Sequence, residues 1–309
     1  MKRTVYASFI LDSKKPFAEI EKDREWVLKT LKQMRVRKFR LAPFGFDFKL
    51  EVNSQAFALW LQALQERPDL APSHIRVKRI YTDQELSSAF LLEWGPTNQA
   101  IEDDYYDLKV DGYQGGPQAS HRRCPACRAE LEQVRDLLVD TRLMGQRDLS
   151  LTYSFEVILS ARLAQRLQEA GFTGFTLRPV WDYRKPYQGE PKLYQLVVTN
   201  ILPPMASPPT EFEQAQHCEV CGTKTQYLKH THFWGRIQYY EETDIYYARE
   251  VLEQAADFNA TYERIGGLPD GHPLVLISQR VYRWLKEQRI KGWSARPVYL
   301  VESGTLTSE

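Results

Sequence analysis

The sequence predicts an α+β fold made of two related halves and a smaller N-terminal unit. Two observations predict the halves: a strand, helix and strand pattern spans residues 157–181 and returns at 275–299, and a C-x-x-C pair precedes each copy. A third observation predicts the separate N-terminal unit, because helical and alternating apolar patterns fill the first 97 residues before either pair begins. With 309 residues, 43% of them hydrophobic, the chain is long enough to build more than one core.

The two copies align without a gap at a constant offset of 118 residues, as between Ser160 and Ser278. A unit of about 25 residues cannot bury its own apolar face, so the copies are expected to pack on each other or on a common sheet. Nine aligned positions are identical: Val157/Val275, Ser160/Ser278, Arg162/Arg280, Leu167/Leu285, Glu169/Glu287, Gly174/Gly292, Arg178/Arg296, Pro179/Pro297 and Val180/Val298.

Each copy contains the same local signals. Ser160 and Ser278 follow three apolar residues and precede an amphipathic run, which is the position of a helix N-cap. Gly174 and Gly292 follow that run and suit the turn into the second strand, which ends in Arg-Pro. Each copy is therefore predicted to form a strand, a helix and a strand.

An arginine stands within the second apolar strand of each copy, at Arg178 and Arg296. A charge among apolar residues is costly to leave unpaired, so each guanidinium is expected at an equivalent position and in contact with a carboxylate or carbonyl group. Glu169 and Glu287 are the candidate partners within the repeat.

The N-terminal unit is predicted to alternate helices and strands. A helix follows Pro16, an alternating strand covers 44–52, a helix begins at Ser54, a strand covers 75–81, and a further helix follows Thr82. The first 40 residues contain 12 Lys or Arg against 5 Asp or Glu. Their helical spacing indicates a solvated helix face rather than a nucleic-acid patch.

Turn-forming and proline-rich segments divide the rest of the chain. The run Gly115-Gly116-Pro117 breaks an acidic stretch, and four prolines within 203–209 form a stiff connector. The expected division is an N-terminal unit at 1–97, a first C-x-x-C half at 98–202 and a second half at 203–309.

All four cysteines belong to two C-x-x-C pairs, Cys124 with Cys127 and Cys218 with Cys221. This spacing lets both thiolates of a pair face one tetrahedral cation from a tight turn. Because one pair precedes each copy of the repeat, pseudo-symmetric halves would bring the pairs together. The leading interpretation is one zinc ion held by all four cysteines.

Other uses of the cysteines remain open in the sequence. His121 and His217 precede the two pairs, and His230 and His232 follow the second one, so two mixed cysteine and histidine sites are a rival arrangement. Redox-active dithiols are less favoured, because neither pair follows the strand expected of a thioredoxin-like motif. Pairs without metal are the last alternative, and structural disulfides are disfavoured in a cytoplasmic protein.

Composition and motifs exclude several classes of function. The net charge is +1, so no global field favours nucleic acid or an anionic membrane as a partner. No apolar run reaches the about 20 residues of a transmembrane helix and the N-terminus has no apolar signal segment, so a cytoplasmic protein is expected. Familiar nucleotide-binding, hydrolase and metalloprotease motifs are absent, which favours a protein that is not an enzyme.

These motifs resemble the double-CXXCG motif family of bacterial immunity proteins, over about residues 105–302. The chain departs from the family pattern after the first pair, where Arg128 stands in place of the glycine; the second pair keeps its glycine, Gly222. About a hundred N-terminal residues also fall outside the resemblance. The matching segments are the two C-x-x-C pairs, Gly222, and the stretches that end in Arg178-Pro179-Val180 and Arg296-Pro297-Val298.

The resemblance implies a non-enzymatic protein that binds a cognate toxin and blocks it. Two acidic, tyrosine-rich segments at 102–111 and 239–247 are expected to supply the contact surface, since tyrosines provide binding area and carboxylates select a basic partner. The alternative is a zinc-ribbon protein that binds nucleic acid or regulates through its basic N-terminal segment. The residues expected at the toxin surface are Tyr105, Tyr106, Asp244, Tyr246 and Tyr247.

Overall fold

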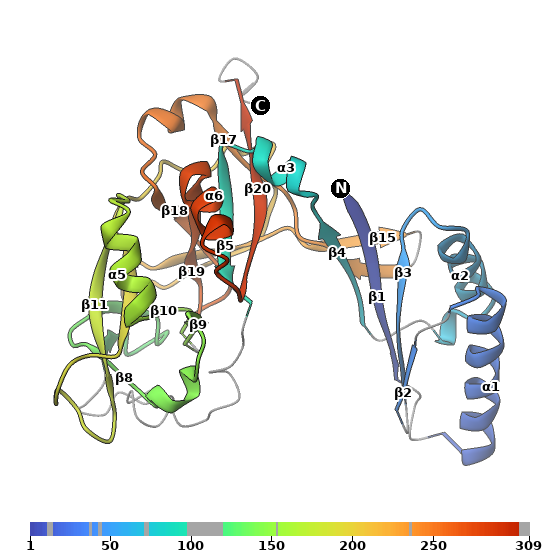
Figure 1. Ribbon diagram of the computed structural model, residues 1–309. Helices are drawn as coiled ribbons and strands as arrows, with labels where there is room; N and C mark the ends of the chain where they lie inside the picture. Colours follow the sequence, from blue (N-terminus) through green and yellow to red (C-terminus); the bar gives the residue numbers. More distant parts are fainter. Residues whose placement is uncertain are drawn as a thin grey trace. The chain divides into compact units, whose positions relative to one another are not determined.

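The computed structural model describes residues 1–10, 15–36, 39–42, 45–70, 74–97, 120–152, 154–234 and 237–302. The chain contains helices together with strands that form several sheets, which confirms the predicted α+β class (Figure 1). The chain forms two compact units. The smaller unit combines Met1–Asp83 with Lys229–Thr243, and the larger unit combines Gln84–Leu228 with Asp244–Glu309.

This division differs from the expected ranges in three respects. The two C-x-x-C halves, expected as separate domains, lie together in the larger unit. Residues 84–97, expected in the N-terminal unit, belong to the larger unit, where Leu91–Pro96 forms an internal strand of a sheet. Residues 229–243, expected in the second half, belong to the smaller unit and complete its sheet. Each unit is therefore built from two separate stretches of chain.

The smaller unit is a six-stranded sheet in the order β15-β16-β4-β1-β3-β2, packed against two helices (Figure 1). Apolar residues of α1 and α2 share one core with β1, β3 and β4, and Trp60 of α2 lies edge-on to Phe48 of β3 at 5.7 Å between ring centroids. The Ser54 hydroxyl caps α2 by accepting from the Phe57 amide at 3.1 Å, as predicted. Its elements are β1 (Lys2–Ile10), α1 (Phe17–Gln33), β2 (Phe39–Ala42), β3 (Gly45–Glu51), α2 (Gln55–Glu66), η1 (Pro68–Leu70), β4 (His74–Ile80), β15 (Thr231–Trp234) and β16 (Ile237–Tyr240).

The larger unit contains two sheets and a separate two-stranded hairpin. The sheet orders are β8-β11-β12-β10-β9 and β13-β14-β18-β19-β5-β20-β17, and the hairpin is β6-β7. The helix α3 (Asp83–Ser88) begins on the last residue of the smaller unit. The elements before Pro203 are β5 (Leu91–Pro96), β6 (His121–Arg123), β7 (Glu130–Gln133), β8 (Leu137–Val139), η2 (Thr141–Met144), β9 (Leu149–Leu151), β10 (Val157–Ser160), α5 (Ala161–Glu169), β11 (Phe175–Asp182) and β12 (Leu193–Val198). The later elements are β13 (Phe212–His217), β14 (Lys224–Leu228), β17 (Ile245–Ala248), η3 (Arg249–Glu253), β18 (Phe258–Ile265), β19 (His272–Ser278), α6 (Gln279–Glu287) and β20 (Trp293–Val301).

The repeated sequences form the same arrangement in both sheets. The elements β10, α5 and β11 correspond to β19, α6 and β20, and the flanking strands β8 and β17 run parallel to β11 and β20 respectively. The strand between the repeated pair differs in origin, since β12 follows the first copy whereas β5 lies far upstream of both copies. The predicted repeat is therefore a structural repeat, and its second copy is completed by a strand from earlier in the chain.

A carboxylate explains the identical serine and arginine of the first copy. Ser160 donates its hydroxyl to Asp148 Oδ1 at 2.8 Å, and its amide donates to the Asp148 carbonyl at 3.0 Å. The Arg162 Nη2 atom lies 2.8 Å from the other carboxylate oxygen of Asp148. Ser160 also caps α5, because its Oγ accepts from the Leu163 amide at 3.2 Å.

The second copy has the same triad with Asp257. Ser278 donates its hydroxyl to Asp257 Oδ1 at 2.8 Å, and Arg280 Nη1 lies 2.8 Å from Asp257 Oδ2. Here the arginine also reaches the first copy, since Arg280 Nη2 donates to the Ala170 carbonyl at 2.7 Å, at the end of α5. The amide of Thr173 donates to Asp257 Oδ2 at 3.1 Å, so one carboxylate fixes both copies.

The two copies also share one apolar core, which confirms that they pack on each other. Leu163 and Leu167 of α5 lie in the same cluster as Val281 and Leu285 of α6. Phe258 of β18 belongs to this cluster and lies edge-on to Trp94 of β5 and to Phe172 of the first copy. Both helices pack into this shared cluster, because a single strand, helix and strand copy could not bury its own apolar face.

The arginine prediction holds for one copy only. Arg296 forms an ion pair with Glu93, the residue opposite it on β5. Arg178 faces Gln195 of β12, and within the described part of the chain its side chain makes no hydrogen bond or ion pair. Glu169 and Glu287 are therefore not the partners. The residue opposite each arginine comes from the neighbouring strand, and it is a carboxylate on β5 but an amide, Gln195, on β12.

Gly174 is required by the contact between the copies, which yields a stability prediction. Its φ of +85° is left-handed, and a Cβ there would lie 2.0 Å from the Phe258 carbonyl oxygen. We expect Gly174→Ala to lower the free energy of unfolding by about 3 kcal/mol or more, through overpacking added to backbone strain. Chemical denaturation followed by circular dichroism measures this change.

Gly171 provides the matched control. It also has a left-handed φ, +63°, but no atom lies within 4 Å of the Cβ position, and Arg289 occupies the equivalent place in the second copy with φ +54°. Gly171→Ala should cost only about 1 kcal/mol. Equal losses in the two variants would contradict a role for Gly174 in close packing.

Candidate metal centre

The first C-x-x-C pair lies in the turn of the hairpin β6-β7. The Cys124 amide donates to the Ala129 carbonyl at 3.0 Å, and the Arg128 amide donates to the Cys124 carbonyl at 2.9 Å. The Ala129 amide lies 3.5 Å from Cys127 Sγ. These bonds close a tight turn that directs both sulfurs to one side.

The second pair lies in the turn of the hairpin β13-β14 and repeats this geometry. The Cys218 amide donates to the Thr223 carbonyl at 3.0 Å, and the Gly222 amide donates to the Cys218 carbonyl at 2.8 Å. Cys221 Sγ lies 3.1 Å from Thr223 Oγ1. The sequence thus folds twice into the same cysteine turn.

The two turns bring all four sulfurs together. Cys124 Sγ lies 3.8 Å from Cys218 Sγ, Cys127 Sγ lies 3.7 Å from Cys221 Sγ, and all four atoms lie within 4.8 Å of one another. Four sulfurs each about 2.3 Å from a tetrahedral zinc ion would be about 3.8 Å apart. A disulfide would need about 2.05 Å, so the spacing fits a shared ion and not a bond.

The four sulfurs differ in burial, and the two half-buried ones differ in pKa. Cys124 and Cys218 are buried, whereas Cys127 and Cys221 are half-buried. Burial raises the pKa of Cys127 to about 12, while hydrogen bonding by Thr223 lowers the pKa of Cys221 to about 6. Ligation requires thiolates, so metal binding must displace protons from this cluster.

Arg128 adopts the backbone conformation that the glycine of the other turn adopts. Its φ is +63°, and the φ of Gly222 is +72°. The departure from the family pattern at Arg128 therefore leaves the turn geometry unchanged. Its consequence is local strain, because a side chain disfavours left-handed φ.

The histidines do not join the cysteines. In the described ranges, no histidine nitrogen belongs to the group of four sulfurs. His121 instead groups with Glu130 and Glu156, and His217 pairs with Glu219 at 2.9 Å. His230 and His232 lie in the smaller unit, stacked on tyrosine rings of β16. The geometry favours one four-cysteine site over two mixed sites.

The structure corrects the expected toxin surface. Tyr105 and Tyr106 lie outside the described residues. Tyr247 is 0% exposed within the core of the larger unit, so it cannot form part of a contact surface. Asp244 and Tyr246 are half-buried, and the Tyr246 ring stacks on Tyr299.

Two further residues of the second acidic segment, Tyr239 and Glu241, are structural. Glu241 is 3% exposed and accepts from Arg3 Nε at 2.8 Å and Arg79 Nε at 2.9 Å. Tyr239 is buried in the core of the smaller unit. The alternation of acidic and aromatic residues here reflects ion pairing and packing, which the sequence pattern alone does not distinguish from a binding surface.

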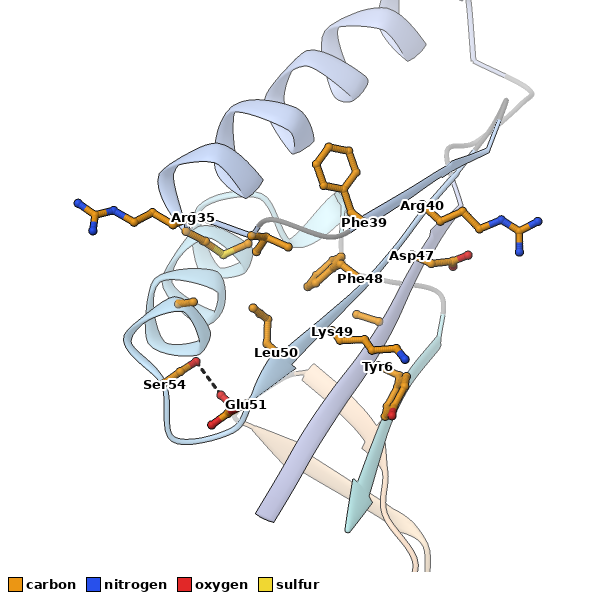
Figure 2. A pocket seen from close by; sticks show the side chains of 14 residues that line it. Tyr6, Arg35, Phe39, Arg40, Asp47, Phe48, Lys49, Leu50, Glu51 and Ser54 are labelled. Carbon is orange, nitrogen blue, oxygen red and sulfur yellow. Dashed lines mark hydrogen bonds between the residues drawn. The ribbon is translucent and has the colours of Figure 1, made fainter. Parts of the chain in front are cut away.

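The smaller unit contains a separate hollow of about 980 Å³ beside β3. Met34, Phe48 and Leu50 supply apolar lining, and Figure 2 shows the Arg35 and Arg40 side chains pointing away from each other. Neither metal-capable group of the described residues lies here. Charged side chains, among them Asp47 and Lys49, line the hollow beside this apolar surface.

No helix in the described residues is both long and apolar enough to cross a membrane. Comparison of the sequence with protein-family models and with curated proteins finds no match, and no solved structure matches the fold.

The matched turns give a prediction about Arg128. Arg128→Gly should raise the free energy of unfolding by about 1 kcal/mol, because glycine adopts positive φ without steric cost. Gly222→Ala should lower it by a similar amount, since no atom within 4 Å would clash with the new Cβ. Thermal unfolding of the zinc-saturated variants tests both changes, and a loss of stability in Arg128→Gly would show that its side chain contributes more than its backbone costs.

Proposed function

We propose that the protein is a zinc-binding immunity protein that neutralises a cognate toxin by steric occlusion. The observation that supports this most is the close approach of four sulfurs from two separate hairpins. Four cysteine ligands fill the coordination shell of zinc and leave no position for water or substrate, so the ion would have a structural role. The resemblance to the double-CXXCG family supplies the toxin as partner.

Zinc would act by fixing the first hairpin. The strands β6 and β7 form a two-stranded sheet of their own, and an isolated hairpin is marginally stable in water. The second hairpin is anchored, because β14 pairs with β18 of the large sheet. One ion between Cys124 and Cys127 of the first turn and the cysteines of the second would join the two-stranded hairpin to the one that belongs to the large sheet.

The contact surface is better placed on the cysteine turns than on the tyrosine-rich segments. Val220, between Cys218 and Cys221, is 66% exposed, whereas Tyr247 is buried. An apolar side chain held outward by a rigid, metal-fixed turn can bind with little loss of conformational entropy. Zinc binding and toxin binding would then be linked through the same hairpins.

Nucleic acid is the less favoured partner. Basic residues near the N-terminus are engaged in ion pairs, including Arg3 with Glu241 and Lys15 with Asp23. These pairs leave less free positive charge for phosphate than the sequence suggests. Binding to nucleic acid that falls steeply with salt would reverse this preference.

The zinc proposal predicts the metal content. Protein purified without chelator and then dialysed should retain one equivalent of zinc, measured by elemental analysis. Cys221→Ser should weaken zinc binding by more than about 100-fold, because it removes a ligand rather than an outer contact. The absence of zinc, or its retention by the variant, would refute the four-cysteine site.

The toxin proposal predicts protection in cells. The product of the adjacent reading frame should be toxic alone and harmless when co-expressed with the wild type. Val220→Glu should abolish protection while keeping its zinc, since a charge would be placed at the centre of the contact. Tyr246→Ala, away from the turns in sequence, should protect as the wild type does. Failure of the wild type to protect would refute the function, and full protection by Val220→Glu would refute only the surface.

A further inference from the structure

Three side chains outside the cysteine turns form a second compact group. His121 lies on β6, Glu130 lies on β7, and Glu156 lies between β9 and β10. One ligand atom from each lies within 4.8 Å of the others. The side chains of His121 and Glu156 are only 9% and 11% exposed, so this is not a cluster of surface charges.

The distance between His121 and Glu156 suggests what the group is suited to hold. His121 Nε2 lies 3.4 Å from Glu156 Oε1. A charge-assisted hydrogen bond between such groups is shorter, about 2.7–2.9 Å. Two ligand atoms each about 2.1 Å from a tetrahedral ion are about 3.4 Å apart. We propose that His121, Glu130 and Glu156 bind a second divalent transition-metal ion.

Neighbouring polar groups orient all three side chains. Ser120 Oγ lies 3.0 Å from His121 Nδ1, and in the tautomer in which Nδ1 donates to this hydroxyl, Nε2 is the ligand atom. The Thr152 hydroxyl donates to Glu156 Oε2, and Arg123 Nη2 donates to Glu130 Oε1 at 2.5 Å. Outer contacts of this kind hold metal ligands in a single orientation.

The group is specific to the first hairpin. Counting from the cysteines, the positions of His121 and Glu130 correspond to Ala215 and Lys224 in the second hairpin. The second cysteine turn forms without an imidazole or a carboxylate at these places. The shared turn geometry therefore does not explain why the first hairpin has them.

One imidazole and two carboxylates suit ions such as Zn²⁺, Co²⁺ or Mn²⁺. The Glu130 carboxylate is shared with Arg123, so Glu156 supplies the carboxylate charge that faces the ion alone, and three protein ligands leave a coordination position for water. The ion would join hairpin β6-β7 to the segment before β10, whereas the cysteine site joins it to the second hairpin. The site is independent of the proposed toxin function.

A cobalt titration of the zinc-loaded protein tests this site. Dialysed wild-type protein, with its cysteine site filled, should bind one further equivalent of Co²⁺ by calorimetry. The near-ultraviolet spectrum should lack the sulfur-to-cobalt charge-transfer bands that replacement of the cysteine-bound zinc would produce. His121→Ala and the isosteric Glu156→Gln should each weaken this binding by about tenfold or more. His217→Ala, beside the other cysteine pair, should leave it unchanged.

Circular dichroism and retained zinc establish that each variant is folded. If His121→Ala does not fold, Glu156→Gln decides the outcome because it preserves the shape of the side chain. Absence of a second equivalent in the wild type, or unchanged affinity in folded Glu156→Gln, would overturn the proposal. Sulfur-to-cobalt bands in the wild type would also overturn it, since the added ion would then occupy the cysteine site.

Discussion

Four sulfurs from two hairpins cannot stay close together as thiolates unless a cation compensates their charge. Their separations, 3.7 and 3.8 Å across the hairpins, match the edges of a tetrahedron around zinc. The rest of the larger unit supports this meeting of the hairpins. Asp257 and the shared apolar core hold the two repeats together, and β14 attaches one hairpin to the sheet of the second repeat.

The repeat was predictable because it depends on local signals. Ser160 and Ser278 cap the predicted helices, and Gly174 and Gly292 take the left-handed backbone that their turns require. Their partners were not predictable. Asp148 precedes its serine by 12 residues and Asp257 by 21, so a gapless alignment does not match them. The place of β5 in the second sheet was not predicted for a similar reason, since nothing in its sequence shows that it pairs with the distant strands β19 and β20.

The group of four cysteines was predictable, because C-x-x-C spacing restricts both sulfurs of a pair to one turn. The exposure of the acidic and aromatic residues was not, because exposure depends on tertiary packing. Tyr247 and Glu241 resemble binding residues in sequence, yet one fills a core and the other neutralises two arginines. His121 was noticed for its closeness to Cys124, whereas its carboxylate neighbour Glu156 becomes apparent only when β9 and β10 are paired.

X-ray absorption at the zinc edge, on dialysed protein containing one equivalent of zinc, tests the central claim most directly. The account predicts a single shell of four sulfur atoms at about 2.3 Å. It predicts no nitrogen or oxygen neighbour at about 2.0–2.1 Å, because the four cysteines complete the shell. A mixed shell of sulfur with nitrogen or oxygen would contradict the joining of the two hairpins through one four-cysteine ion.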